Sequence, residues 1–396
     1  MRAIWKRAGL KLGLAVLLLG GAQALCGAWG TNGIAAAADN ETVLPQNVWY
    51  ADPAAKDGSI IRQGKILVPV RTAALQLQMG LYRNAAAHTV TLLNPVHRIV
   101  FQPGVRTAVV DGKKAGLDMA PVIVNGSLYV PFRFLAQTFG YPLGKRDSQY
   151  IMTFRNPYSE GQFGSETYWM NNAGGDLYYS NGTTAPARIG KLDMRIQGLG
   201  GISVEKTGKH SILLTVRDNY GEDIMGAHTD VYQALLLNNR VLTESKVNYT
   251  GSFNINNVKS YEGDPVMIDG SSAKRVDPDT GRTVKTYDMA ALTGGNPKDS
   301  YDLEYVSDDI LLIRPFSTSM LTAVDLETKQ TTALYKKLLP DDQQKWLEAT
   351  AAPNGANGYQ GDGLLFVKRA GNGFEFQWYD PKLRKKVILK WDDSNR

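Results

Sequence analysis

The chain has 396 residues, more than one ordinary hydrophobic core accommodates, so at least two domains are expected. With 43% hydrophobic and 21% charged residues, the composition is that of a folded chain and excludes a disordered one. Forty glycines and nineteen tyrosines favour β structure with many tight turns. The formal net charge of +6 is small for this length, and we expect no nucleic-acid partner.

The first 38 residues have the pattern of a signal peptide. Four basic residues between positions 2 and 11 precede the apolar segment Leu12–Gly20, and four alanines at 35–38 offer a cleavage site. Cleavage after Ala24 is an alternative. The apolar segment is too short for a comfortable transmembrane helix, and no later segment reaches 18 apolar residues. We therefore expect an exported protein without a transmembrane segment.

Cys26 is the only cysteine. Lipidation of this residue is an alternative, but Leu25 stands where a lipoprotein signal requires a small residue. Cleavage after Ala38 leaves a chain without disulfides or thiolate metal ligands. An exported protein without disulfides suggests a Gram-positive bacterium as the source.

The positive charge is unevenly distributed. The signal peptide holds four of the six net charges, which leaves +2 for the rest of the chain. Residues 39–158 contain 13 Lys and Arg against 7 Asp and Glu, so this segment carries +6 and the remainder −4. A basic surface attracts anionic wall polymers or membrane surfaces, although a solvated surface without a partner is the simpler interpretation.

Residues 39–57 form a polar lead-in with one expected strand around Val48–Tyr50. An internal repeat follows, because Lys65–Arg71 (KILVPVR) recurs as Ser127–Arg133 (SLYVPFR). In each copy an apolar strand is expected to end at proline, followed by a short helix that ends at Gly80 or Gly140 and then by another strand. The shared structural positions are Val68, Pro69, Arg71, Val130, Pro131 and Arg133. The symmetry of the two arginines favours a structural role, such as bonds to backbone carbonyls, over ligand binding.

Between the two copies we expect a β-meander. The pairs Asp111-Gly112 and Asn125-Gly126 supply the positive φ angles that two-residue hairpin turns require. The ordered motifs over residues 58–155 resemble the copper amine oxidase-like N-terminal domain, also called the stalk domain. This resemblance implies a small α+β module with two related strand-helix-strand repeats, found on exported bacterial proteins. It does not imply oxidase activity.

A linker is expected at 156–164, where turn-forming residues cluster. Beyond it, residues 165–391 contain short apolar segments and three similar hairpin sequences that begin near Asp277, Asp325 and Asp380. These aspartates are 48 and 55 residues apart, the spacing of propeller blades. We therefore expect a multidomain chain, in which the α+β stalk-type domain precedes an all-β, β-propeller-like domain of about four to five blades.

The sequence lacks the residues that copper amine oxidases use to form their quinone and to bind copper. The segment Thr215–Glu222 only partly matches the quinone-forming motif of copper amine oxidases, and the four histidines include no His-x-His copper pair. No catalytic serine, zinc-peptidase or nucleotide-binding motif is present. We expect no cofactor, metal site or catalytic residue. The adjacent carboxylates at 308–309 and 341–342 are interpreted as turns, and Asp277–Gly281 as a β-turn rather than a calcium loop.

Several aromatic residues form a speculative carbohydrate platform. They are Trp169, Tyr178, Tyr179, Trp378 and Tyr379. Packing in the core is the alternative role for such strand residues.

The sequence thus predicts an exported, non-catalytic protein of the cell surface or cell wall that binds or interacts. An anionic cell-wall polymer or surface polysaccharide is the expected partner. The alternative is a polysaccharide-processing enzyme with its site in the propeller funnel, because a glycosidase needs only two carboxylates and no longer motif. An enzyme would show converging carboxylates in a deep pocket, and a binding module a shallower site with scattered polar groups. The ligand and the oligomeric state do not follow from the sequence.

Overall fold

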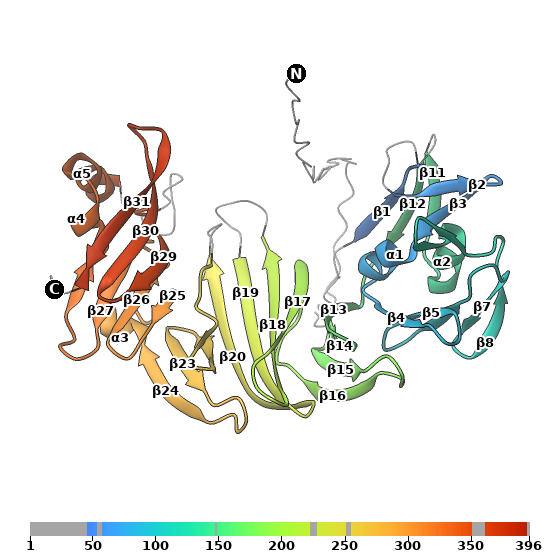
Figure 1. Cartoon of the computed structure of the whole chain (residues 1–396), viewed down its shortest axis with the longest axis horizontal. Helices are drawn as coiled ribbons and strands as arrows, with labels where there is room; N and C mark the ends of the chain where they lie inside the picture. Colours follow the sequence, from blue (N-terminus) through green and yellow to red (C-terminus); the bar gives the residue numbers. More distant parts are fainter. Residues whose placement is uncertain are drawn as a thin grey trace, which may run out of the picture. The chain divides into compact units, whose positions relative to one another are not determined.

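The computed structural model describes residues 46–53, 58–146, 149–221, 228–250, 255–350 and 361–393 (Figure 1). The predicted signal peptide, Cys26 and the start of the lead-in lie outside these residues. Strands make up 54% and helices 11%, so the protein is mostly β and consists of many small sheets. Within the described residues, no helix is both long and apolar enough to cross a membrane.

The two copies of the internal repeat lie side by side and pair with each other. β3 (Lys65–Pro69) is antiparallel to β10 (Ser127–Pro131), with Val68 opposite Val130. β2 (Ile60–Arg62) and β9 (Val122–Val124) complete the sheet in the order β2-β3-β10-β9. Each central strand runs through its proline directly into a helix, as predicted.

The two helices end differently. α1 (Val70–Gln76) and α2 (Phe132–Phe139) begin after Pro69 and Pro131, which are their N-cap residues. α2 ends at Gly140 with a left-handed φ of 66°, as expected. The predicted end of α1 at Gly80 is wrong, because Leu77 is the C-cap and Gly80 begins the next strand.

Two further sheets complete the N-terminal part. The first is the predicted meander, with strands in the sequential order β4 (Gly80–Asn84), β5 (Thr89–Leu93), β6 (Arg98–Phe101), β7 (Thr107–Val110) and β8 (Lys113–Gly116). Asp111, Gly112, Asn125 and Gly126 all have positive φ, which confirms both hairpin turns. In the second sheet, β12 (Gln149–Phe154) lies between β1 (Asn47–Ala51) and β11 (Leu143–Arg146).

The linker predicted at 156–164 is wrong. Most of it is β13 (Tyr158–Phe163), the first strand of a four-stranded sheet, and Tyr158 is buried. Gly161 lies within this strand rather than in a turn, and close packing explains the glycine. A Cβ atom there would lie 2.8 Å from the side chains of Ile202 and Val204 in the next sheet.

Five antiparallel sheets follow one another from residue 158 to the C-terminal end of the described chain, each with its strands in sequential order (Figure 1). The first contains β13, β14 (Glu166–Asn171), β15 (Asp176–Ser180) and β16 (Ala187–Lys191). The second contains β17 (Leu199–Lys206), β18 (Ser211–Tyr220), β19 (His228–Leu237) and β20 (Arg240–Thr250). The third contains β21 (Ser260–Tyr261), β22 (Asp264–Asp269), β23 (Ser272–Val276) and β24 (Thr283–Asp288).

The fourth sheet contains β25 (Tyr301–Val306), β26 (Ile310–Pro315), β27 (Thr322–Asp325) and β28 (Thr331–Ala333). The fifth has three strands, β29 (Leu365–Ala370), β30 (Gly373–Asp380) and β31 (Lys385–Asp392). Successive sheets share hydrophobic clusters, such as the one that joins Leu312 of β26 to Phe376 of β30. Burial of apolar residues between neighbouring sheets therefore holds this series together.

The three repeated aspartates have the same local structure. Asp277, Asp325 and Asp380 each follow or end a strand, and one Oδ1 atom accepts two backbone N–H groups, two and three residues later, at 2.8–3.0 Å. Each side chain thus closes an Asx turn in the hairpin before the last strand of its sheet. This confirms the interpretation of Asp277–Gly281 as a turn.

The expectation that residues 165–391 are all-β is wrong in one respect. The described residues of this region include three helices, α3 (Met289–Thr293), α4 (Leu334–Leu338) and α5 (Asp341–Thr350). Asp341 and Asp342 stand in the first turn of α5 rather than in a β-turn. Carboxylates are favourable there because the helix dipole is positive at its N-terminus.

Glu160 on β13 is a partly buried carboxyl group without a cationic partner in the described part of the chain. Its pKa is raised by desolvation from 4.5 to about 7. Below about pH 4.5 both folded and unfolded chains hold the proton, so Glu160 has no effect on stability. Between pH 4.5 and 7 only the folded chain holds it, so raising the pH destabilises the fold, and above pH 7 the full cost applies.

Replacing Glu160 with glutamine should therefore stabilise the protein at pH 8 and have little effect at pH 4.5. At about 1.4 kcal/mol for each pH unit between the two pKa values, the gain at pH 8 is at most about 3.5 kcal/mol. Urea unfolding of both proteins across this pH range measures it. A variant whose stability relative to the parent does not change with pH would contradict the raised pKa of Glu160.

Candidate ligand-binding pocket

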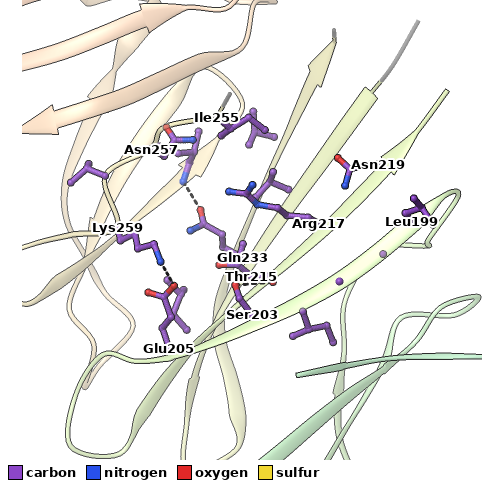
Figure 2. A pocket seen from close by; sticks show the side chains of 18 residues that line it. Leu199, Ser203, Glu205, Thr215, Arg217, Asn219, Gln233, Ile255, Asn257 and Lys259 are labelled. Carbon is purple, nitrogen blue, oxygen red and sulfur yellow. Dashed lines mark hydrogen bonds and ion pairs between the residues drawn. The ribbon is translucent and has the colours of Figure 1, made fainter. Parts of the chain in front are cut away.

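A pocket with a volume of about 570 Å³ lies on one face of the β17–β20 sheet (Figure 2). β18, β19 and β20 have 10 or 11 residues, whereas β22 and β23 of the next sheet have 6 and 5. The shorter sheet packs on Leu213 and Leu235 through Met267 and Val276. We attribute the cavity to the part of the long strands beyond this cluster.

The floor of the pocket is a regular grid of side chains, because alternate residues of each strand point to the same face. One row across the sheet contains Gly201, Arg217, Val231 and Val247. The adjacent row contains Ser203, Thr215, Gln233 and Ser245. An apolar row with one cation therefore lies beside a row of hydroxyl and amide groups.

The opposite wall is the segment 255–259, which is bonded to β25. The Val258 amide donates to the Leu303 carbonyl at 2.7 Å, and the Leu303 amide donates to Oδ1 of Asn257 at 2.8 Å. Nδ2 of Asn257 donates to the Tyr249 hydroxyl at 2.8 Å. The side chain of Asn257 is thus held from two sides, and the wall is fixed to both neighbouring sheets.

A buried carboxyl group lies behind this wall. Asp302 is almost completely buried, and its Oδ2 accepts the Asn256 amide at 3.1 Å, whereas Oδ1 has no hydrogen-bond partner among the described residues. Desolvation raises the pKa of Asp302 to about 7. Burial also raises the pKa of Tyr249 well above its ordinary value, although the positive charge of Arg217 acts in the opposite direction.

Three charged side chains line the pocket. Glu205 and Lys259 form an ion pair with each other, whereas Arg217 is exposed and forms no hydrogen bond or ion pair with another described residue (Figure 2). The lining therefore carries one net positive charge, centred on Arg217.

This arrangement suits binding better than the hydrolysis of a glycosidic bond. Glycosidases use two carboxyl groups on opposite sides of the bond they cleave. The pocket is lined by one carboxylate, Glu205, whose charge is already neutralised by Lys259. Across the described part of the chain, no three His, Cys, Asp or Glu side chains are placed to hold a metal ion.

Four of the six shared positions of the internal repeat lie in the core or begin a helix, and the two arginines do neither. Val68 and Val130 are buried in the N-terminal core, and Pro69 and Pro131 cap the two helices. Arg71 and Arg133 do not bond backbone carbonyls as expected. Both are exposed and have no hydrogen bond or ion pair within the described residues. Each arginine is the second residue of its helix and lies on the side that faces solvent, which explains why it bonds no backbone carbonyl.

The predicted aromatic platform does not form a common surface. Trp169 is 0% exposed and packs with Leu93 and Tyr158, and Trp378 is buried in the core of the last two sheets. Tyr178 packs edge-on against Tyr158, and Tyr179 donates its hydroxyl to Glu166 at 3.0 Å. Only Tyr379 is mostly exposed, at 55%. Neither tryptophan can stack on a ligand, so the alternative of core packing holds for both.

The pocket residues were not singled out in the sequence, although a signal was present. Thr215, Arg217 and Asn219 belong to the segment that partly matched the quinone motif. In the structure Thr215–Tyr220 belong to β18, and Thr215, Arg217 and Asn219 line the pocket, whereas Val216 and Asp218 face the other way and are buried. Polar residues at alternate positions of a long apolar strand mark an uncovered sheet face.

Comparison with solved structures finds only weak likenesses. A puromycin-hydrolyzing peptidase of Mycobacterium tuberculosis is 12% identical over 78% of this chain and 46% of that chain, with a TM-score of 0.27. A nidogen/laminin complex is 9% identical over 73% of this chain and 92% of that one, with a TM-score of 0.22. AztD of Citrobacter koseri is 10% identical over 80% and 83%, also with a TM-score of 0.22. These scores are too low to support an argument about fold or function.

Comparison with protein families is informative for the N-terminal part alone. No curated protein matches the chain significantly. The family model of the copper amine oxidase N-terminal domain matches residues 53–153, and the rest of the chain has no named family. This range contains both copies of the repeat and the meander between them. Residues 53–153 are therefore similar to the copper amine oxidase N-terminal domain.

Proposed function

We propose that this chain is an exported, non-catalytic binding protein of the bacterial cell surface or cell wall. In this proposal the N-terminal stalk-type domain attaches the protein to an anionic surface polymer. The following sheets form a propeller-like array of four to five blades, which presents the pocket over β17–β20. The pocket is a place of binding and not of reaction.

The observation that carries the proposal is the charge arrangement in the pocket. Arg217 offers a guanidinium group that pairs with no described residue, and the one lining carboxylate is bound by Lys259. A cation without a partner in a cavity attracts an anionic ligand. The alternative of a polysaccharide-processing enzyme lacks the second carboxyl group in this cavity, and no other observation favours it.

The propeller-like arrangement is supported by repetition. Four sheets have four strands in sequential antiparallel order, and the hairpin before the last strand carries the same Asx turn in the last three sheets. Sequential four-stranded sheets of this kind are the units of propellers.

Attachment through the stalk-type domain is supported by its surface charge. Several of its basic side chains are exposed and have no ion pair with a described residue; they include Arg62, Arg71, Arg83, Lys113, Lys114, Arg133 and Arg146. Such a surface binds polyanions through long-range attraction, which added salt weakens.

We expect residues 39–396 to be retained on purified Gram-positive cell wall and to be released as NaCl is raised from 0.05 to about 0.5 M, because salt screens the attraction. Removing the anionic polymers from the wall should abolish retention. Replacing both Arg71 and Arg133 with glutamine should weaken it several-fold, because each removes an exposed, unpaired charge. Sedimentation of the protein with the wall measures the bound fraction.

The matched control replaces Lys385 and Lys386, two exposed cations of β31, with glutamine. This variant loses the same charge but should be retained like the parent. Equal loss from both variants would mean that net charge alone causes retention, and no retention of the parent would refute wall attachment.

A further inference from the structure

We infer that the pocket over β17–β20 binds an organic anion that carries an aliphatic group, with the anionic group on Arg217 and the aliphatic group over Val231 and Val247. This inference rests on the proposed function only in treating the pocket as a binding site. It does not depend on attachment to the cell wall.

Arg217 is free to receive an anionic group. Its neighbours across the sheet are Gly201, which has no side chain, and Val231, which offers no hydrogen bond. A Cβ atom at Gly201 would meet nothing within 4 Å, so the space beside Arg217 is open. The planar guanidinium group can donate two parallel hydrogen bonds to a carboxylate or phosphate.

Two polar side chains flank Arg217 on the same strand and the same face. The hydroxyl of Thr215 and Nδ2 of Asn219 have no hydrogen-bond partner among the described residues, while Oδ1 of Asn219 accepts the Thr229 hydroxyl at 2.8 Å. Both free groups can donate to oxygen atoms. A ligand oxygen at Arg217 would therefore have further donors within the same strand.

Most of the remaining lining is aliphatic. These residues are Leu199, Leu213, Val231, Val247, Ile255, Val258 and Ile268. No aromatic side chain lines the pocket, so it lacks the flat surface on which sugar rings stack. The volume of about 570 Å³ is within the range of small-molecule sites. An aliphatic chain fits this lining better than a neutral sugar does.

The ion pair of Glu205 with Lys259 explains why an anion is favoured over a cation. Lys259 holds the only carboxylate of the lining, so a cationic ligand would have to displace it and would also meet the charge of Arg217. An anionic ligand meets no such cost.

Titration calorimetry of residues 39–396 tests this inference with decanoate and decyl phosphate, both below their micelle concentrations. Both should bind, whereas decanol, which has no charge, and acetate and inorganic phosphate, which have no aliphatic chain, should bind at least about tenfold more weakly. Replacing Arg217 with glutamine should weaken decanoate binding by about tenfold or more, because a charge-assisted hydrogen bond is lost. Since Arg217 is exposed, the variant should keep the melting temperature of the parent.

Two further variants separate the contributions. Replacing Arg240, an exposed cation of β20 outside the pocket, with glutamine should leave binding unchanged. Leu199 lies at the pocket edge and is 62% exposed. Replacing it with serine should weaken decanoate binding, while the ratio of the affinities for decanoate and decanol should stay that of the parent.

The sources of such an anion are distinguished by comparing free decyl phosphate with vesicles of phosphatidylglycerol. Binding of the free compound indicates a soluble ligand, and Arg217-dependent binding of vesicles alone indicates a membrane lipid; either supports the inference. Binding of decanol equal to that of decanoate, or equal binding by the parent and the Arg217→Gln variant, would overturn it. Failure of wall retention with intact decanoate binding would refute only the attachment proposed above.

Discussion

Replacing Arg314 with leucine is expected to lower the free energy of unfolding by about 3–5 kcal/mol. The side chain of Arg314 on β26 is 12% exposed and lies between the carboxylates of Glu304 and Asp362, which are 4% and 0% exposed. It also donates to the carbonyls of Ser319 and Leu364 at 2.6 Å. The substitution leaves two buried carboxylates without a cation, and their desolvation is then uncompensated.

The effect should depend on pH in a defined direction. Buried carboxylates without a cation have raised pKa values, so acid neutralises them in the folded variant. The destabilisation by Arg314→Leu should therefore be smaller at pH 4 than at pH 8, and further replacement of Glu304 with glutamine and Asp362 with asparagine should restore part of the lost stability. Urea unfolding at both pH values measures these differences.

The control is the same substitution at a surface ion pair. Arg188 pairs with Asp176 at 2.7 Å but is 55% exposed, and Arg188→Leu should cost less than about 1 kcal/mol. If the two substitutions lower the free energy of unfolding equally, the buried network of Arg314, Glu304 and Asp362 does not stabilise the fold more than a surface ion pair does.

Replacing Trp169 with alanine is expected to cost about 3–5 kcal/mol of stability, because it leaves a large cavity between Leu93, Tyr158 and the neighbouring rings. Trp169→Phe should cost less than Trp169→Ala. The phenyl ring refills part of the space and removes a buried indole N–H, which has no hydrogen-bond partner among the described residues. Denaturant unfolding gives both values.

Tyr379→Ala is the matched control, since this residue of the same predicted platform is mostly exposed. It should change stability by less than about 0.5 kcal/mol. If Trp169→Ala left the unfolding free energy unchanged and instead abolished binding of a carbohydrate, Trp169 would belong to a carbohydrate platform. Its assignment to the core would then be wrong.

The location of the pocket has a simple structural reason. Its sheet has longer strands than the next one, so part of an otherwise apolar face is not covered by a neighbour. Side chains in that part are free to be polar, as Thr215, Arg217 and Asn219 are. Substitutions at these three positions would change which ligand binds and would have little effect on the hydrophobic core. Function on a given fold usually resides in such site residues.

Local features of this protein were determined by the sequence alone. The strand that runs through proline into a helix, the hairpins at Asp111-Gly112 and Asn125-Gly126 and the Asx turn at Asp277 all depend on residues a few positions apart. Proline fixes its φ angle, glycine and asparagine permit positive φ, and an aspartate oxygen reaches the amides that follow it. These constraints act before any distant contact forms.

Other features depend on what packs against each face of a sheet, and only the tertiary structure decided these. The sequence predicts a linker at Gly161, whereas in the structure Ile202 and Val204 occupy the space beside this residue. Trp169 is covered by Leu93 and Tyr158 and is not available to a ligand, and the sheet face that carries Arg217 is uncovered. Burial, pairing and the pKa values of Glu160 and Asp302 arise from contacts between distant segments, which no local pattern encodes.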